Sequence, residues 1–309
     1  MTAGTTVLPG APRRVRARLA GPRPAWLASL ALFVVVGVAY AAGSEMAYHW
    51  FGADVSPVFF PSAGVTVGAL ALAPWGRWPA VLAGAGTAEL VVDLSQGTGL
   101  ALTLGFVTAN LVEATVAALA LRAVAPRPDL SRRRDLLAFL GLAVVVAPAV
   151  GGAIGASDIA LFAGGDDWVT YAGRWWLGDG LGILIVGGGV LAARSLRPPG
   201  RRAAAWWAEA LLLVSAVAAA TVAMFWLEEL RWAYLPAVVL PWIALRLGTR
   251  GVALAGAAIS FIAAHAVAGG HDLWTQLDVA PRTGLVYLQL LIAIGVSTAL
   301  MLAAEVRER

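Results

Sequence analysis

The sequence predicts an all-α membrane protein, a polytopic transmembrane bundle of about eight to ten helices with both termini in the cytoplasm. Its residues are 60% hydrophobic and only 13% charged, and the mean hydropathy of +0.79 excludes a soluble fold. Apolar stretches long enough to cross roughly 30 Å of hydrocarbon follow one another from Trp26 almost to the C-terminus. Lipid cannot pair free backbone groups, and the alternating segments of a membrane barrel are absent, so the stretches must be helices.

Clusters of charge, Gly and Pro separate ten candidate helices. The expected spans are 26–46, 58–74, 79–94, 100–124, 136–162, 174–193, 206–227, 233–247, 251–268 and 283–304. The second, third and eighth are short and broken by Pro or Gly, so they could be re-entrant or merged with a neighbour. Eight helices is therefore the alternative count, and the number of crossings is even in both cases.

The distribution of arginine sets the expected orientation. All 22 basic residues are Arg. With the N-terminus inside, only Arg174, Arg231 and Arg282 fall on the far side of the membrane, where most acidic residues also lie. This asymmetry is what the positive-inside rule requires, and it predicts a multi-pass protein of a bacterial inner membrane.

Three regions follow from these spans. Residues 1–25 form a disordered basic cytoplasmic tail, residues 26–304 the transmembrane domain, and residues 305–309 a short cytoplasmic end. The basic start and the apolar run after it resemble a signal peptide, but no convincing cleavage site follows, so we interpret the run as an uncleaved helix. The loops are short, which leaves the bundle, the loops or a separate partner to carry the function.

Motifs of catalysis and cofactor binding are absent. The chain has no Cys, which excludes disulfides, thiolate metal sites and Cys nucleophiles. It has no Walker loop, Rossmann fingerprint, HExxH or GxSxG motif. The pI near 10.1 reflects Arg between the spans rather than a nucleic-acid-binding face. We therefore expect no enzymatic activity, no metal, no cofactor and no nucleic-acid partner, and the bilayer as the main partner.

Ionisable residues within the spans are functional candidates, because each costs ~2.5 to 3.5 kcal/mol to insert. Asn110 and Glu113 are three residues apart and share one helix face, so both can point into the bundle. Glu89 follows small residues that allow close helix packing, and we expect a buried partner such as an Arg or a backbone amide. For all three, an interhelical hydrogen bond of structural value and a role in binding a signal remain open.

Asp179 lies in the segment Trp175-Trp176-Leu177-Gly178-Asp179-Gly180. Indole rings favour the membrane interface, so anchoring accounts for Trp175 and Trp176, although both are also candidates for signal binding. No interface preference accounts for a carboxylate between glycines. An ion pair with Arg174 or a site for a polar ligand would account for Asp179.

Several motifs together resemble MASE1, a membrane-associated sensor domain family. The resemblance covers roughly residues 26–304 and the motifs occur in the family's order. They are Phe60-Pro61-Ser62-Ala63-Gly64, Pro74-Trp75-Gly76-Arg77-Trp78-Pro79, Ala109-Asn110-Leu111-Val112-Glu113-Ala114, Trp175 to Gly182 with Gly178 and Asp179, and Tyr234-Leu235-Pro236 through Pro241-Trp242 to Arg246 and Gly248. Phe60 stands where Trp is usual, and Glu89 where Asn is commoner.

The resemblance implies a sensory domain of the kind found before bacterial histidine kinases and diguanylate cyclases. A cluster of Asn110, Glu113, Asp179 and Glu89 would then bind the cue or transmit it. The sequence ends at Arg309, where an output domain would normally follow, so we expect a kinase or cyclase module acting in trans, or self-association. Two alternatives stay open: a small-molecule transporter, which carboxylates in interrupted helices would also fit, and a scaffold or accessory subunit.

Overall fold

The computed structural model describes residues 25–50, 58–194, 203–227, 234–271, 273–274 and 278–309. Within these ranges the chain forms helices and no strands, which confirms the all-α prediction. The expected basic tail falls outside the described residues except for Ala25. The helices are α1 (Ala25–His49), α2 (Pro61–Leu72), η2 (Trp75–Arg77), α3 (Trp78–Ser95), α4 (Leu100–Val124), α5 (Arg133–Ala138), η3 (Phe139–Val146), α6 (Ala147–Phe162), α7 (Trp168–Gly182), η4 (Ile183–Gly187), α8 (Gly188–Ala193), α9 (Ala203–Trp226), α10 (Tyr234–Ala268) and α11 (Pro281–Glu308).

Two continuous helices, which we call rods, each combine several of these elements. Residues 133–162 form one rod, in which η3 is a stretch of wider π-helical turns. Residues 168–193 form the other rod, in which η4 is also π-helical. Counting these rods once, seven helices in the described part of the chain are long and apolar enough to cross a membrane. Such π-helical interruptions occur frequently at functional sites.

Helix α10 is two antiparallel helices rather than one. A straight helix would separate Leu240 from Ile259 by about 28 Å, yet both side chains line the same small cavity. The chain reverses at Gly248, where φ is 68° and ψ is −162°. The expected helices at 233–247 and 251–268 are therefore both present, joined by a very tight turn.

The ten expected helices can thus all be recognised, although α2 and α3 differ from full spans. Helix α2 has 12 residues, about 18 Å, and most of them are buried inside the bundle. Helix α3 carries two buried acidic residues, Glu89 and Asp93. The expectation that both segments are short holds for α2, whereas α3 is a continuous helix of 18 residues.

Several predicted boundaries are wrong by up to six residues. The rod expected to begin at Arg174 begins at Trp168, because the Asp167 carboxylate caps it by accepting a hydrogen bond of 3.1 Å from the Thr170 N–H. The last helix runs to Glu308, so most of the expected cytoplasmic end at 305–309 is helical.

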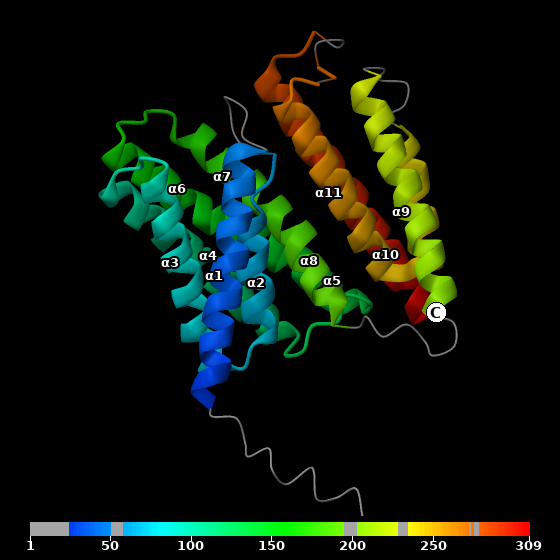
Figure 1. Cartoon of the computed structure of the whole chain (residues 1–309), viewed down its shortest axis with the longest axis horizontal. Helices are drawn as coiled ribbons and strands as arrows, with labels where there is room; N and C mark the ends of the chain where they lie inside the picture. The colour runs from blue at the N-terminus through cyan, green and yellow to red at the C-terminus, as the bar shows by residue number, and fades with distance from the viewer. Residues whose placement is uncertain (1–24, 51–57, 195–202, 228–233, 272, 275–277) are drawn as a thin grey trace, which may run out of the picture.

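Successive helices alternate in direction, and the start of α1 and the end of α11 lie at the same end of the bundle (Figure 1). Helix α10 packs against both α9 and α11, and this group meets the other helices through α10 on α8 and η4 and through α11 on α5 and α7. The even number of passes expected from the sequence accounts for the shared end.

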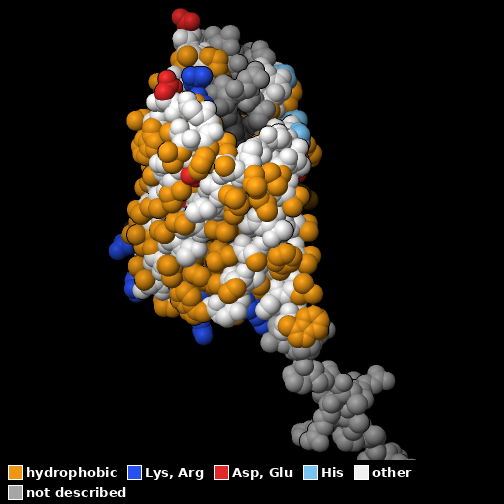
Figure 2. All heavy atoms as spheres, turned by 90° about the vertical axis from the view of Figure 1, so that its left-hand side faces the viewer, with side chains coloured by type: hydrophobic (Ala, Val, Ile, Leu, Met, Phe, Trp, Pro, Cys, Tyr) orange, Lys and Arg blue, Asp and Glu red, His pale blue; other side chains and the backbone are white. Residues whose placement is uncertain are grey.

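Apolar side chains cover much of the face turned to the viewer in Figure 2, with acidic side chains mostly toward the upper end and arginines mostly toward the lower end. The lower end is the one that holds both termini. The described arginines lie in loops and helix ends at that end, except Arg174 and Arg282.

Glycines allow α2 and α7 to touch through their backbones. A Cβ at Gly182 would overlap the carbonyl oxygen of Phe60, and one at Gly64 would overlap that of Gly182. This close approach fixes the segment before α2 against α7, next to Asp179.

Candidate functional site

The four polar residues singled out from the sequence come together inside the bundle. Their side chains are almost completely buried: Glu113 is 1% exposed, Glu89 3%, Asp179 5% and Asn110 8%. The Asn110 side-chain amide of α4 donates a hydrogen bond to Glu89 Oε1 of α3. The expected partner of Glu89, an Arg or a backbone amide, was therefore the wrong group, although a buried partner exists.

The two tryptophans of α7 have different environments. The Trp175 indole N–H donates to Glu113 Oε2 at 3.3 Å, and its ring packs edge-on against Phe106, with centroids 5.3 Å apart. Interface anchoring thus does not account for Trp175, which faces the bundle interior. Trp176 is 39% exposed and donates to the Val145 carbonyl at 2.8 Å.

Asp179 faces Glu113 and Trp175. Its carboxyl lies within hydrogen-bonding reach of the Glu113 carboxyl, and both are near the indole of Trp175. Asn110 and Glu113, which share a face of α4, thus connect to two different helices: Asn110 to α3 and Glu113 to α7.

Asn110, Trp175 and Asp179 border a cavity of about 220 Å³ between α1, α3, α4, α6 and α7, which we call the polar cavity. Its polar walls are formed by Glu89, Asp93, Asn110 and Asp179, with Arg174 as the single basic side chain in its lining. Its aromatic walls are formed by Tyr48, Phe60, Phe106, Tyr171 and Trp175. Tyr48 is 42% exposed, so the cavity reaches the surface there.

The polar cavity lies in the half of the bundle far from the chain termini. Tyr48 is near the end of α1, Asp93 near the end of α3 and Phe106 near the start of α4, and these helix ends lie opposite the termini (Figure 1). The Tyr48 hydroxyl donates to Asp93 Oδ1 at 3.0 Å and holds the mouth of the cavity together.

Four oxygens of the cavity walls have no hydrogen-bond partner in the described structure. They are Glu89 Oε2, Asp93 Oδ2, Asn110 Oδ1 and Asp179 Oδ2. A buried polar atom left unpaired costs about 1 to 3 kcal/mol. Four such atoms belong to side chains that line one cavity, and the Tyr40 hydroxyl, which is also buried and unpaired, lies close to Glu89.

Sequence reasoning missed Asp93, Tyr48 and Phe106. Asp93 follows Glu89 by four residues, so helical spacing alone puts both on one face of α3. That signal was available in the sequence. Tyr48 and Phe106 come from different helices and only tertiary packing brings them to the cavity.

Two hydrogen bonds connect the polar cavity to the last helix. The Phe60 N–H donates to the Gly178 carbonyl at 3.0 Å, beside Asp179. Two residues earlier, the Val58 carbonyl accepts a hydrogen bond of 2.8 Å from the side-chain amide of Gln289 on α11, which is 4% exposed. The residues 58–60 therefore touch both α7 and α11.

Most other motif residues of the sequence lie outside the polar cavity. Pro61 and Pro79 occupy the first turns of α2 and α3, where Pro is well tolerated. Arg246 pairs with Glu209 of α9 at 2.5 Å, and Trp242 is 57% exposed. Gly178 is an exception, because it lines the cavity.

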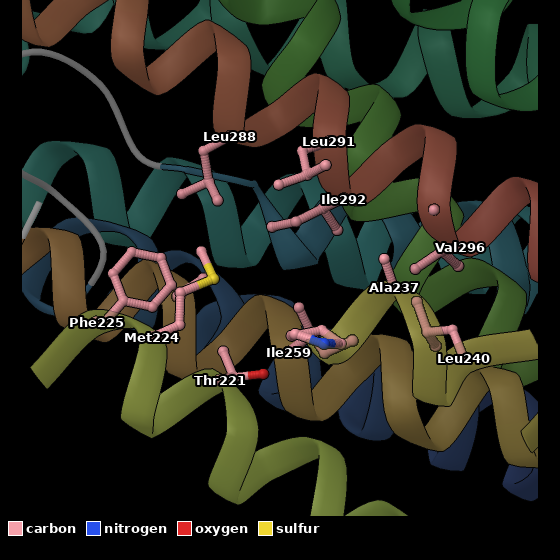
Figure 3. A pocket seen from close by; sticks show the side chains of 13 residues that line it. Thr221, Met224, Phe225, Ala237, Leu240, Ile259, Leu288, Leu291, Ile292 and Val296 are labelled. Carbon is pink, nitrogen blue, oxygen red and sulfur yellow. The ribbon is translucent and has the colours of Figure 1, made fainter. Parts of the chain in front are cut away.

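A second cavity, of about 60 Å³, lies between α9, α10 and α11 and includes Pro236 in its lining. Figure 3 shows apolar side chains such as Phe225, Met224 and Leu288 around it. The hydroxyl of Thr221 in its wall donates to the Val217 carbonyl. The cavity is lined by apolar atoms almost throughout and offers nothing to orient a polar ligand.

The end of the molecule that holds the termini carries a polar network around Asp129. Burial would raise the pKa of Asp129, but hydrogen bonds from Ser131 and the positive charges of Arg307 and Arg132 outweigh it, so the pKa is lowered. Nearby, the Arg133 N–H donates to Glu308 Oε1 at 2.7 Å. The end of α11 is thus held against the start of α5.

The MASE1 family model matches residues 26–309, and the chain therefore belongs to the MASE1 family, a family of membrane sensory domains. This match covers nearly the whole sequence and confirms the resemblance seen in its motifs. No curated protein and no solved structure matches the chain.

Proposed function

We propose that this MASE1 domain is a sensor of a bacterial inner membrane, in which the polar cavity detects a cue and α11 passes the signal to a kinase or diguanylate cyclase module. The observation that carries the proposal is the position of the unpaired oxygens of Asn110 and Asp179. They belong to side chains of the polar cavity, next to hydrogen bonds that join residues 58–60 to α7 and α11.

The signal is passed on by movement of helices. A cue held between Glu89 on α3 and Asp179 on α7 changes the position of α7 relative to α3. The Phe60–Gly178 bond makes residues 58–60 follow α7, and Gln289 makes α11 follow residues 58–60. Helix shifts of about 1–2 Å are a common form of such switching.

Transport is the second candidate function, because a buried carboxylate, Asp179, in a rod with a π-helical interruption also fits a translocation site. The two functions differ in what crosses the membrane. Uptake by the protein reconstituted in vesicles would identify a transporter, whereas a sensor changes its output without net uptake.

The test is a fusion of a diguanylate cyclase after Arg309, with cyclic di-GMP as the output. Asp179→Asn and Glu113→Gln each keep the shape of the side chain but change its charge and hydrogen bonding. We expect both to shift the output at least threefold while the melting temperature in detergent changes by only about 2 °C or less. A change in output without a change in melting temperature indicates a role in signalling rather than in packing.

Glu209→Gln is the matched control, because it also removes a carboxylate but lies on α9, paired with Arg246 and away from the polar cavity. It should leave the output unchanged. If Asp179→Asn and Glu113→Gln leave the output at the control level, the polar cluster has only a structural role and the proposal is wrong.

A further inference from the structure

The polar cavity has the features of a site for a small organic cation. Three carboxyl groups, of Glu89, Asp93 and Asp179, contribute to its walls, and each keeps an oxygen without a hydrogen-bond partner. Glu89 lies close enough to both Asp93 and Asp179 for mutual repulsion. Carboxylates buried this deeply need either protons or a positive charge nearby, because an unpaired buried charge is costly.

Arg174, the basic residue in the lining, does not by itself supply the positive charge that the three carboxyl groups need. Arg174 lies on the first turns of α7, on the same side as the capping carboxylate Asp167, with which it interacts electrostatically. It also lines a separate cavity that faces α11. One arginine shared in this way faces three carboxyl groups, so the polar cavity retains an excess of acidic groups.

The rest of the wall is aromatic, which favours an organic cation over a metal ion. Phe60, Phe106 and Trp175 present rings next to the acidic groups. An ammonium group is attracted both to carboxylates and to the faces of aromatic rings. Among the described residues no group of three or more His, Asp or Glu side chains could hold a metal ion.

The size of the cavity fits the same ligand class. A volume of about 220 Å³ exceeds that of an engineered cavity of about 150 Å³ that binds benzene in another protein. It therefore accommodates an aromatic or branched amine. The Asn110 Oδ1 atom supplies a neutral acceptor beside the carboxylates.

We propose that the polar cavity binds a protonated organic amine, with its ammonium group among Glu89, Asp93 and Asp179 and its apolar part against Phe60, Phe106 and Trp175. This deepens the sensory proposal and rests on it for the statement that the amine is a cue. The binding site itself does not depend on the signalling role.

The test uses the purified full chain in lipid nanodiscs and three probes of similar size: benzylammonium, neutral benzyl alcohol and anionic benzoate. Binding is measured at one pH by calorimetry and by the fluorescence of the tryptophans. We expect saturable binding of benzylammonium only. Asp179→Asn and Glu89→Gln should each weaken it at least tenfold, while Glu209→Gln should leave it unchanged.

Equal binding of all three probes would show that there is no amine site. The absence of benzylammonium binding to a protein that melts cooperatively would show the same. Because a variant could misfold, each is first compared with the parent chain by its melting curve, and Asp93→Asn serves as an independent third variant. If the cyclase fusion responds to Asp179→Asn but no amine binds, the ligand class is wrong and the sensory role stands. If amine binds but the fusion is insensitive, the sensory role is wrong and the site stands.

Discussion

At the residue scale, Gly182 is the glycine of α7 where an added Cβ would meet the closest neighbouring atom. A Cβ there would overlap the Phe60 carbonyl oxygen, whereas a Cβ at Gly173 on the same helix meets nothing within 4 Å. We expect Gly182→Ala to lower the free energy of unfolding by about 2 to 3 kcal/mol. Gly173→Ala should be neutral or stabilising by up to about 1 kcal/mol. Melting curves in detergent compare the two, and equal stability would contradict the close approach of α2 and α7.

Gln289 is the residue that tests the connection between the cavity and α11. Gln289→Met keeps the length of the side chain but removes its donor, leaving the buried Val58 carbonyl unpaired at a cost of about 1 to 3 kcal/mol. We also expect it to abolish the effect of Asp179→Asn on the cyclase fusion. Tyr287→Leu, on the exposed side of the same helix, is the control. Additive effects of Gln289→Met and Asp179→Asn on the output would contradict coupling through residues 58–60.

Whether the sequence predicts the role of a single residue depends on how far along the chain its interaction partner lies. The cost of burying charge in lipid singled out Glu89, Glu113 and Asp179, and all three border or adjoin one site. Gln289 was not identified, because its partner Val58 is 231 residues away in the chain. The inward position of Trp175 was also missed, since the interface preference of indole rings is an average that a carboxylate such as Glu113 can override.

At the scale of the elements, α10 depends on the conformation of one residue. Gly248 has φ 68° and ψ −162°, a region that is essentially restricted to glycine and costs other residues about 1 to 3 kcal/mol. Gly248→Ala should therefore lower the melting temperature, although its Cβ would have open space. Gly189→Ala in α8, where space is also open but φ is not positive, should not. An unchanged melting temperature for Gly248→Ala would show that the turn can form without positive φ.

Periodicity and breakers predicted the elements well because membrane helices are bounded by charge, Gly and Pro. The break between 247 and 251 was found from Gly248 and the flanking Arg residues, and the structure places the reversal there. The start of the rod at Trp168 was missed, because the cap by Asp167 is a local hydrogen bond inside a polar loop. The π-helical turns of η3 and η4 were not predicted from the sequence; in the fold η3 lies against α4, η4 lies against α2, and the two stretches contact each other.

At the scale of the whole molecule, the arrangement of charge predicts which side of the membrane the cue comes from. The polar cavity opens at the end opposite the termini, and the arginines other than Arg174 and Arg282 lie at the termini in the described structure. If the positive-inside rule holds, the termini face the cytoplasm and the mouth of the cavity at Tyr48 faces the periplasm. The sensor would then detect a cue outside the cell and deliver the signal through α11 inside it.

The absence of Cys from the sequence makes this orientation directly measurable, because a single introduced thiol has no background. Gly99 precedes α4 at the end near the cavity, and Gly76 lies in η2 at the end of the termini; a Cβ at either position meets nothing within 4 Å. A membrane-impermeant maleimide should label Gly99→Cys in intact cells and Gly76→Cys only after the inner membrane is permeabilised. The reverse pattern would place the cavity mouth in the cytoplasm, because the two positions lie at opposite ends of α3, and a periplasmic cue would then be excluded.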